Sequence, residues 1–361
     1  MPYQQTSQCR FYVCSLQWLK SLGLLSAYND QGSFDAGYSP EYNPMDMIGI
    51  NPTIPYRLFS VNGGAVQWSF EYPSTHLFSD KSWFALLGHN LAVQASTGNS
   101  VYIWSLAGTA PLANIGDSVN IIGADTAGTV RQNGYDGYSF MTFDWSGDNL
   151  PSTMFDIKFD LYNFADLVLC NTLCMGTYYE MPHSPDLSLT LNYEYGGSKT
   201  IETRGGSSLS NTTWTKQPNW NNGGAWELYE EFSDNMDIQQ FSRSGRKVWN
   251  LSFSFLDDGD IFGSNSSVSF ADFTQFGLTA DNFDLSDTSN NNFKYNLLND
   301  DNFFSQVVHK TLGAGNLPFI FQPDKEDFSN MAICKFDQQN ISFQQKSPSL
   351  YSVQMKIREV W

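Results

Sequence analysis

The sequence lacks any run of apolar residues near the ~18 needed to cross a bilayer as a helix. Its first fifteen residues, MPYQQTSQCRFYVCS, also lack the basic-then-apolar layout of a secretion signal. These absences predict a protein that is made and folded in a cytosol, without membrane insertion. In that compartment the five cysteines, an odd number in apolar surroundings, are expected to be free, buried thiols.

Basic residues are scarce. Lys and Arg total 19 against 37 Asp and Glu, which gives a formal net charge of -18 and a sequence pI of about 4.4. Because binding to nucleic-acid phosphates requires clustered Lys and Arg, we expect no stable nucleic-acid complex. An acidic surface keeps a protein soluble and repels DNA.

Catalytic motifs are also missing. The chain has no nucleophile elbow, no Gly-rich phosphate loop and no paired carboxylates in a strand context. The four His residues, at positions 76, 89, 183 and 309, never fall at a ligand spacing. We therefore predict a protein that is not an enzyme and has no catalytic, cofactor-binding or metal-binding residue. A polysaccharide hydrolase stays open as an alternative, because two glycosidase carboxylates can be distant in sequence.

Two clusters carry metal-ligand side chains at unsuitable spacings. Cys170 and Cys174 are separated by three residues, and no second Cys or His pair follows them. Asp257, Asp258 and Asp260 lack the Glu that ends a calcium loop, so we expect a solvated loop. The acidic region 257–302 is long for a structureless connection, which favours contact with a partner.

Aromatic and turn-forming residues are abundant: aromatics make up 16% of the chain, which also has 28 Gly and 14 Pro. This composition predicts a mainly β protein with few short helices. We expect residues 1–55 to form an N-terminal arm and extended linker packed on the C-terminal domain. Residues 56–176 should form a jelly-roll-like β-sandwich module, and residues 177–361 a second β-sandwich domain with a short helix near 301–312.

The module at 56–176 contains short strand segments separated by turn signals. Its segment WFALLGHNLA resembles the central strand of jelly-roll carbohydrate-binding modules, in which His89 would contact a ligand; the alternative is a turn His that bonds its own backbone. Four tryptophans either form a sugar-stacking platform or belong to the core: Trp68, Trp83, Trp104 and Trp145. A glycan-binding receptor protein is therefore a second alternative.

The second domain shows period-two alternation. The positions Leu187, Leu189, Leu191 and Tyr193 alternate with polar residues, which predicts a strand that turns at Gly196-Gly197 and returns over Lys199–Thr203. Three more strands are expected near the C-terminus, at Leu317–Phe321, Met331–Phe336 and Leu350–Val360. The last of them alternates cleanly and predicts a sheet with one buried face.

Several of these segments resemble the distal tail and lambda-type minor tail proteins of tailed bacteriophages. The matching pieces are Val248–Phe255, Phe303–Lys310, Leu317–Pro323 and Tyr351–Trp361. Tyr178–Leu209 is also similar to structural proteins of marine and cyanobacterial phages. The resemblance implies a homo-oligomeric ring at the tail tip, or baseplate, with sixfold symmetry favoured over threefold. Such a ring joins the tail tube to the hub and adsorption apparatus.

In such a ring, Val248–Leu256 and Leu317–Trp361 would build the ring-forming sandwich, and closure would remove unpaired strand edges. The module at 56–176 would be peripheral and able to touch a host surface glycan. Trp361 either docks on a neighbouring subunit or caps its own core. The implied partners are copies of the chain, the tail tube, and hub or fibre proteins. The implied place is the distal end of the virion's tail, assembled in the host cytoplasm, with genome DNA passing through the lumen.

Overall fold

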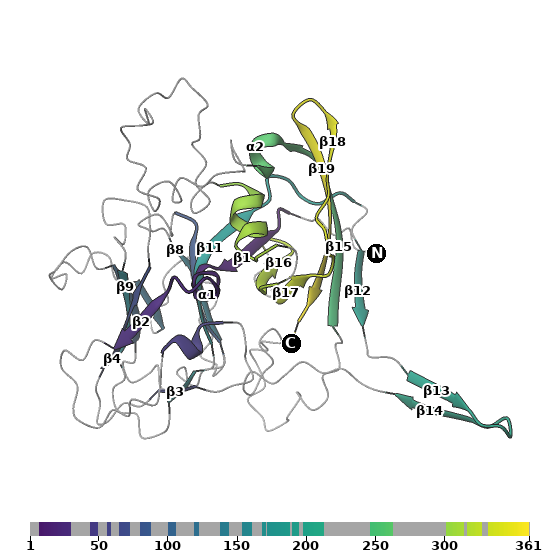
Figure 1. Ribbon diagram of the computed structural model, residues 1–361, viewed down its shortest axis with the longest axis horizontal. Helices are drawn as coiled ribbons and strands as arrows, with labels where there is room; N and C mark the ends of the chain where they lie inside the picture. Colours follow the sequence, from purple (N-terminus) through teal and green to yellow (C-terminus); the bar gives the residue numbers. More distant parts are fainter. Residues whose placement is uncertain are drawn as a thin grey trace.

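The computed structural model (Figure 1) shows a mainly β protein with few short helices, which confirms the predicted fold class. The residues that it describes are 7–29, 44–49, 56–58, 65–72, 80–87, 100–105, 119–122, 138–143, 154–160, 168–170, 172–187, 190–194, 198–212, 246–262, 301–313, 316–326 and 331–360. No helix among these residues is long and apolar enough to span a membrane.

The largest element is a ten-stranded antiparallel sheet. In spatial order its strands are β12 (Thr190–Glu194), β15 (Arg246–Asp257), β19 (Leu350–Glu359), β17 (Ala332–Phe336), β16 (Phe319–Gln322), β1 (Arg10–Cys14), β11 (Thr172–Glu180), β5 (Ser82–Leu87) and β8 (Tyr138–Phe143); β18 (Phe343–Ser347) pairs with β19 outside this path. The predicted C-terminal strands are therefore present as β16, β17 and β19.

Three smaller sheets accompany it. A five-stranded sheet has the order β2 (Ser26–Asn29), β4 (Ala65–Glu71), β9 (Met154–Asp160), β6 (Ser100–Ser105) and β7 (Val119–Ile122). Two-stranded ribbons pair β3 (Tyr56–Leu58) with β10 (Val168–Cys170), and β13 (Ser198–Glu202) with β14 (Ser208–Thr212).

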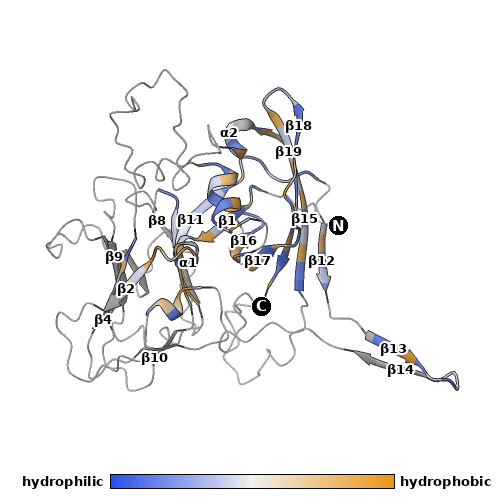
Figure 2. Ribbon diagram, in the orientation of Figure 1, coloured by the Kyte–Doolittle hydropathy of each residue, from blue (hydrophilic) through white to orange (hydrophobic). Residues whose placement is uncertain are grey.

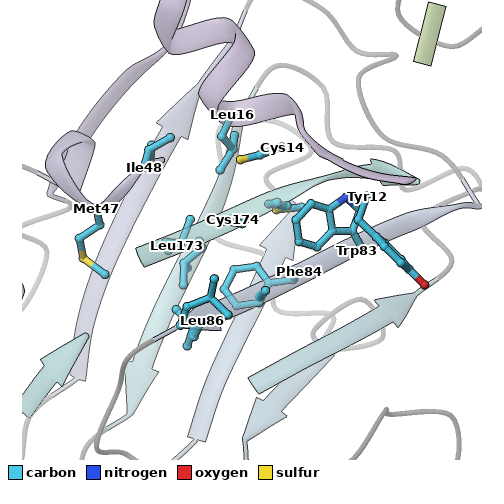
Figure 3. Packing of buried hydrophobic residues seen from close by; sticks show 14 of the residues in the cluster. Tyr12, Cys14, Leu16, Met47, Ile48, Trp83, Phe84, Leu86, Leu173 and Cys174 are labelled. Carbon is cyan, nitrogen blue, oxygen red and sulfur yellow. The ribbon is translucent and has the colours of Figure 1, made fainter. Parts of the chain in front are cut away.

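Strand β1 lies at the centre of the large sheet and is buried on both faces. Because successive side chains of a strand point to opposite faces, Phe11 and Val13 enter one hydrophobic core while Tyr12 and Cys14 enter the other. Figure 3 shows Tyr12 and Cys14 in the second core, with Trp83 and residues of β5 and β11. Figure 2 shows the hydrophobic colouring concentrated in these central elements.

Short helices complete the two cores. They are α1 (Ser15–Ser21), the 3-10 turn η1 (Pro44–Met47), α2 (Asp258–Ile261) and the π-helix η6 (Phe304–His309). The helix predicted near 301–312 is therefore present as η6. Phe303, at its N-cap, packs edge-on against Phe11 with ring centroids 5.5 Å apart.

The large sheet continues across the domain boundary predicted at residue 176. Strand β11 straddles that boundary, β1 from the predicted N-terminal arm pairs with both β11 and β16, and β5 and β8 extend the same sheet. The physical reason is long-range pairing: alternation within a strand shows which face is buried but not which distant strand lies beside it.

Candidate assembly surface

Strand β12 ends one side of the large sheet. It pairs with β15, with Leu191 opposite Trp249 and Tyr193 opposite Lys247. Leu191 and Tyr193 are exposed although they lie on the same face as the buried Trp249. An edge strand presents backbone N–H and C=O groups that can pair with another chain. Within the described residues, β12 therefore combines a sheet edge with exposed apolar side chains.

The β13–β14 ribbon projects away from the sheet beyond β12 (Figure 1). We call it the arm, residues 198–212. Its strands are antiparallel with Ile201 directly opposite Leu209, and these side chains are 66% and 61% exposed. The turn lies at Thr203–Ser207, where the Thr203 N–H donates to the Ser207 carbonyl at 2.8 Å. Gly206 has a φ of +82°, a backbone conformation that residues with a Cβ atom rarely adopt.

The prediction that Lys199–Thr203 returns along the preceding strand is wrong. Strand β12 pairs with β15, while β13 pairs with β14, so the hairpin turn falls at Thr203–Ser207 and not at Gly196-Gly197. Sequence reasoning chose the nearest turn signal, and Gly205-Gly206 offered an equal one.

The arm has two chemically different faces. Alternation and register place Lys199, Ile201 and Leu209 on one face, which we call the arm face. The opposite face carries hydroxyl side chains and Glu202. Figure 2 shows a hydrophobic position on β13 in otherwise hydrophilic surroundings. The arm is thus a ribbon with apolar side chains on one side only.

Phe255 is an exposed aromatic in a strained position. It is 73% exposed, lies where the pairing of β15 with β19 shifts register, and has a φ of +63°. A bulky residue in this left-handed region is uncommon and costs about 1–3 kcal/mol. Strain that persists at a bulge often serves to aim a side chain. Here the side chain aimed into solvent is aromatic.

Leu187 lies on the same part of the surface as Phe255. The preceding residue, Asp186, donates its N–H to the Ser252 carbonyl at 2.8 Å and accepts from the Ser254 hydroxyl at 2.9 Å. Leu187 and Phe255 therefore flank one pair of hydrogen bonds. Leu187 is 87% exposed.

Exposed apolar side chains concentrate on this end of the molecule. Eight large hydrophobic side chains are exposed among the described residues, and six of them belong to β12, its approach, the arm or the β15 bulge. Four form what we call the edge patch, and the other two belong to the arm face. The edge patch consists of Leu187, Leu191, Tyr193 and Phe255. Concentrations of this kind mark interaction sites.

Charged groups hold the edge in place. Glu194 of β12 accepts two hydrogen bonds from the Arg358 guanidinium, at 2.7 and 3.0 Å. Glu359, fully buried, accepts from the Lys247 N–H at 2.8 Å. Burial, and then the neighbouring Arg358, lower the pKa of Arg246. These contacts tie β12, β15 and β19 together, so the edge patch rests on a fixed support.

Of the four tryptophans considered for sugar stacking, the structure describes the side chains of two. Trp68 and Trp83 are buried in the core, and the Trp83 indole N–H lies 3.2 Å from the Val13 carbonyl and 3.3 Å from the Thr177 carbonyl. The stacking interpretation is wrong for these two, because a buried ring offers no face to a sugar. The side chain of Trp104, together with Trp145 and His89, lies outside the described residues.

The candidate metal ligands do not converge. The Asp257 N–H donates to the Asp260 carboxylate at 3.1 Å, and Asp260 accepts from the Tyr179 hydroxyl through its carbonyl at 2.8 Å, so this acidic turn makes protein contacts. Cys174 is buried and forms no disulfide, while the side chain of Cys170 and the whole of Trp361 lie outside the described residues. In the described ranges no group of three or more His, Cys, Asp or Glu residues is placed to hold a metal ion.

Sequence reasoning missed one buried polar cluster. Lys310 is fully buried, and its ammonium group donates to Gln306 Oε1 at 2.7 Å and to Thr177 Oγ1 at 3.0 Å. Burial lowers the pKa of Lys310 to about 7. A lysine that titrates near neutrality is often a functional group, yet a substrate cannot reach a side chain with no exposed surface. We therefore interpret this cluster as structural.

Comparison with protein-family models, curated proteins and solved structures found no match.

Proposed function

We propose that this chain is a structural subunit of a bacteriophage tail tip, which associates with copies of itself into a ring between the tail tube and the hub. The observation that supports this proposal is the concentration of exposed apolar side chains on one sheet edge and its arm. A folded monomer gains nothing from keeping these side chains in water. An assembly subunit needs them.

A ring is the form of association that suits this surface. Proteins protect an exposed edge strand by pairing it or covering it. A contact between two different surfaces forms a closed ring when the rotation between neighbouring subunits brings the last copy back to the first. The edge belongs to β12, because β15, which the sequence placed in the ring-forming sandwich, is already paired on both sides. The sixfold number, with threefold as its alternative, comes from the resemblance of the C-terminal segments to tail-tip proteins.

The proposed subunit has no catalytic role. Its partners would be its own copies, the tail tube, and hub or fibre proteins, at the distal end of the virion's tail after assembly in the host cytoplasm. The net charge of -18 suits a lumen through which DNA passes without binding. A peripheral contact with host surface glycan belongs to the same proposal, without Trp68 and Trp83 as contact residues.

Light scattering on the purified full-length chain tests the proposal. We expect a particle of six times 40.7 kDa, and electron microscopy should show a ring with an open lumen. A protein that stays monomeric at every accessible concentration would contradict it. Release of sugars from host polysaccharide by the purified chain would instead favour a hydrolase.

A further inference from the structure

We propose that the arm face of one copy docks on the edge patch of the next copy, so that subunits join arm to patch in a single direction. This inference rests on the proposed self-association and names the two surfaces that make it. The arm face is Lys199, Ile201 and Leu209, and the edge patch is Leu187, Leu191, Tyr193 and Phe255.

The arm needs a partner to be well ordered. A two-stranded ribbon on its own is marginally stable in water, and three or more strands or a packed face are needed for independent stability. In the described chain, strands β13 and β14 pair only with each other. Docking the face that carries Ile201 and Leu209 would bury both side chains, each worth about 1.5–3 kcal/mol when fully buried.

The edge patch offers an apolar surface of matching character. Its four side chains follow the last strand of the sheet and the bulge beside it, and Phe255 is held outward by a backbone of positive φ. Its support is rigid because β12 is bonded to β15 and Glu194 is paired with Arg358. The apolar face of the arm and the apolar side chains of the edge patch can therefore cover each other.

Charge favours a second copy of this chain as the occupant. The arm carries Lys199 and Arg204 against a single Glu202, so it is locally basic in a chain with a net charge of -18. Asp186 and Asp257 lie close to Leu187 and Phe255 in the chain, and Lys247 lies opposite Tyr193, so the acidic character of the partner comes from the body as a whole. Opposite charges at the rim steer partners together and set their orientation. A basic arm therefore suits the acidic body of its own kind.

The arm does not cover the patch of its own copy. Figure 1 shows the arm extending away from the sheet, and the patch side chains remain exposed. Since arm face and edge patch are different surfaces, the contact is heterologous, and each copy uses one of each. A chain of such contacts either closes into a ring or grows as a filament.

Two full-length variants test the direction of the contact. The arm variant, Ile201→Thr with Leu209→Thr, removes the apolar side chains while keeping strand-forming residues. The patch variant, Leu187→Ser with Phe255→Asn, removes two exposed side chains and places a residue that tolerates positive φ at the bulge. The matched control, Thr200→Ala with Ser210→Ala, changes the same two strands on the opposite face.

Each variant alone should be monomeric, with self-association weakened roughly 100-fold. Mixed in equal amounts, the two variants should form a 1:1 heterodimer, because one intact arm meets one intact patch. The control should form the wild-type ring. Native mass spectrometry distinguishes the variants by mass.

Three outcomes overturn the inference. An arm variant that still forms the ring, or a mixture without heterodimer, shows that arm and patch do not meet, while the ring proposal stands if the wild type assembles. A monomeric wild type defeats the proposed function itself, and the inference with it.

Discussion

Ile201 and Leu209 lie directly opposite each other across the arm, and both side chains are mostly exposed to water. Cross-strand apolar pairs normally stabilise a ribbon by packing against a third element. Here the described part of the chain supplies none. The pair is therefore positioned for contact with another molecule. Substitutions in the arm should change this contact without changing the fold of the large sheet.

A disulfide across the opposite face of the arm should strengthen self-association. Thr200 and Ser210 are also directly opposite, so Thr200→Cys with Ser210→Cys places two thiols at a separation that a disulfide can span. Locking the ribbon removes part of the ordering entropy lost on binding. Analytical ultracentrifugation should show a several-fold lower dissociation constant, which a reducing agent reverses. Unchanged association in the oxidised variant would show that the arm is not part of the contact.

The native cysteines must be told apart from the two new ones. Cys9, Cys14, Cys174 and Cys334 are buried and form no disulfide. Burial raises the pKa of the Cys9 and Cys334 thiols well above its usual value, so the thiolate needed for disulfide exchange is absent near neutral pH. Burial acts on Cys14 too, but a hydrogen bond with Cys174 and backbone hydrogen bonds outweigh it and lower the pKa of Cys14. Peptide mapping must therefore show that the new bond joins residues 200 and 210.

Replacing Phe255 by Gly should stabilise the monomer and weaken assembly. Glycine adopts positive φ without strain, which recovers part of about 1–3 kcal/mol, although its greater freedom in the unfolded chain offsets about 0.5–1 kcal/mol. The aromatic ring is lost from the edge patch, so self-association should fall. Urea denaturation and light scattering measure the two effects separately. Loss of stability together with assembly would indicate that Phe255 supports the fold.

Phe253 is the control for this prediction. It lies two residues earlier on β15 and is fully buried, so Phe253→Ala should lower the free energy of unfolding by about 3–5 kcal/mol. The contrast between two Phe residues of one strand follows from their burial.

Replacing Lys310 by Met should abolish a rise of stability with pH. The pKa of Lys310 is lowered to about 7 by burial, whereas in the unfolded chain it is about 10.4. Between these values the unfolded chain binds one more proton than the folded chain, so wild-type stability increases with pH by up to about 1.4 kcal/mol per unit. Below pH 7 both states are protonated, and the full penalty of the buried charge remains.

The Lys310→Met variant should therefore be more stable than the wild type at pH 7, with the difference shrinking toward pH 10. The Thr177 hydroxyl donates to Gln306 Oε1 at 2.8 Å, and we expect this hydrogen bond to remain in the variant. Urea midpoints of the two proteins between pH 6 and 10 give the measurement. Taking their difference cancels the contributions of other buried groups, among them the Cys9 and Cys334 thiols, whose raised pKa values act in the opposite direction. Parallel pH profiles for the two proteins would contradict the prediction.

The sequence predicted which segments form strands better than it predicted which strands lie side by side. In β19 the alternation of Val353, Met355 and Ile357 identified the buried face, and these side chains are buried. The predicted division at residue 176 has no counterpart in the large sheet, because β1 and β11 pair across about 165 residues of sequence. The edge patch could not be predicted from the sequence, since Leu187 and Leu191 alternate as core residues do. Leu191 lies on the last strand of the sheet and Leu187 just before it, and both are exposed.

Gly176 makes this long-range pairing testable. A Cβ atom at this position would lie 2.0 Å from the Val13 carbonyl oxygen and 2.7 Å from the Ser15 nitrogen, so β11 and β1 could not keep their separation. The indole of Trp83 lies within 3.3 Å of carbonyl oxygens on both strands, which leaves little room for adjustment. We expect Gly176→Ala to lower the free energy of unfolding by about 3–5 kcal/mol.

Hydrogen exchange along the sheet is a more specific test than the free energy of unfolding. If the large sheet is one cooperative unit, hydrogen exchange in Gly176→Ala should accelerate together in β5 on one side of the affected strands and in β16 on the other. Acceleration confined to one side would instead indicate two units that meet at β11. The control Gly205→Ala has open space around the new methyl group and lies in the arm, so its stability should stay within about 0.5 kcal/mol of wild type.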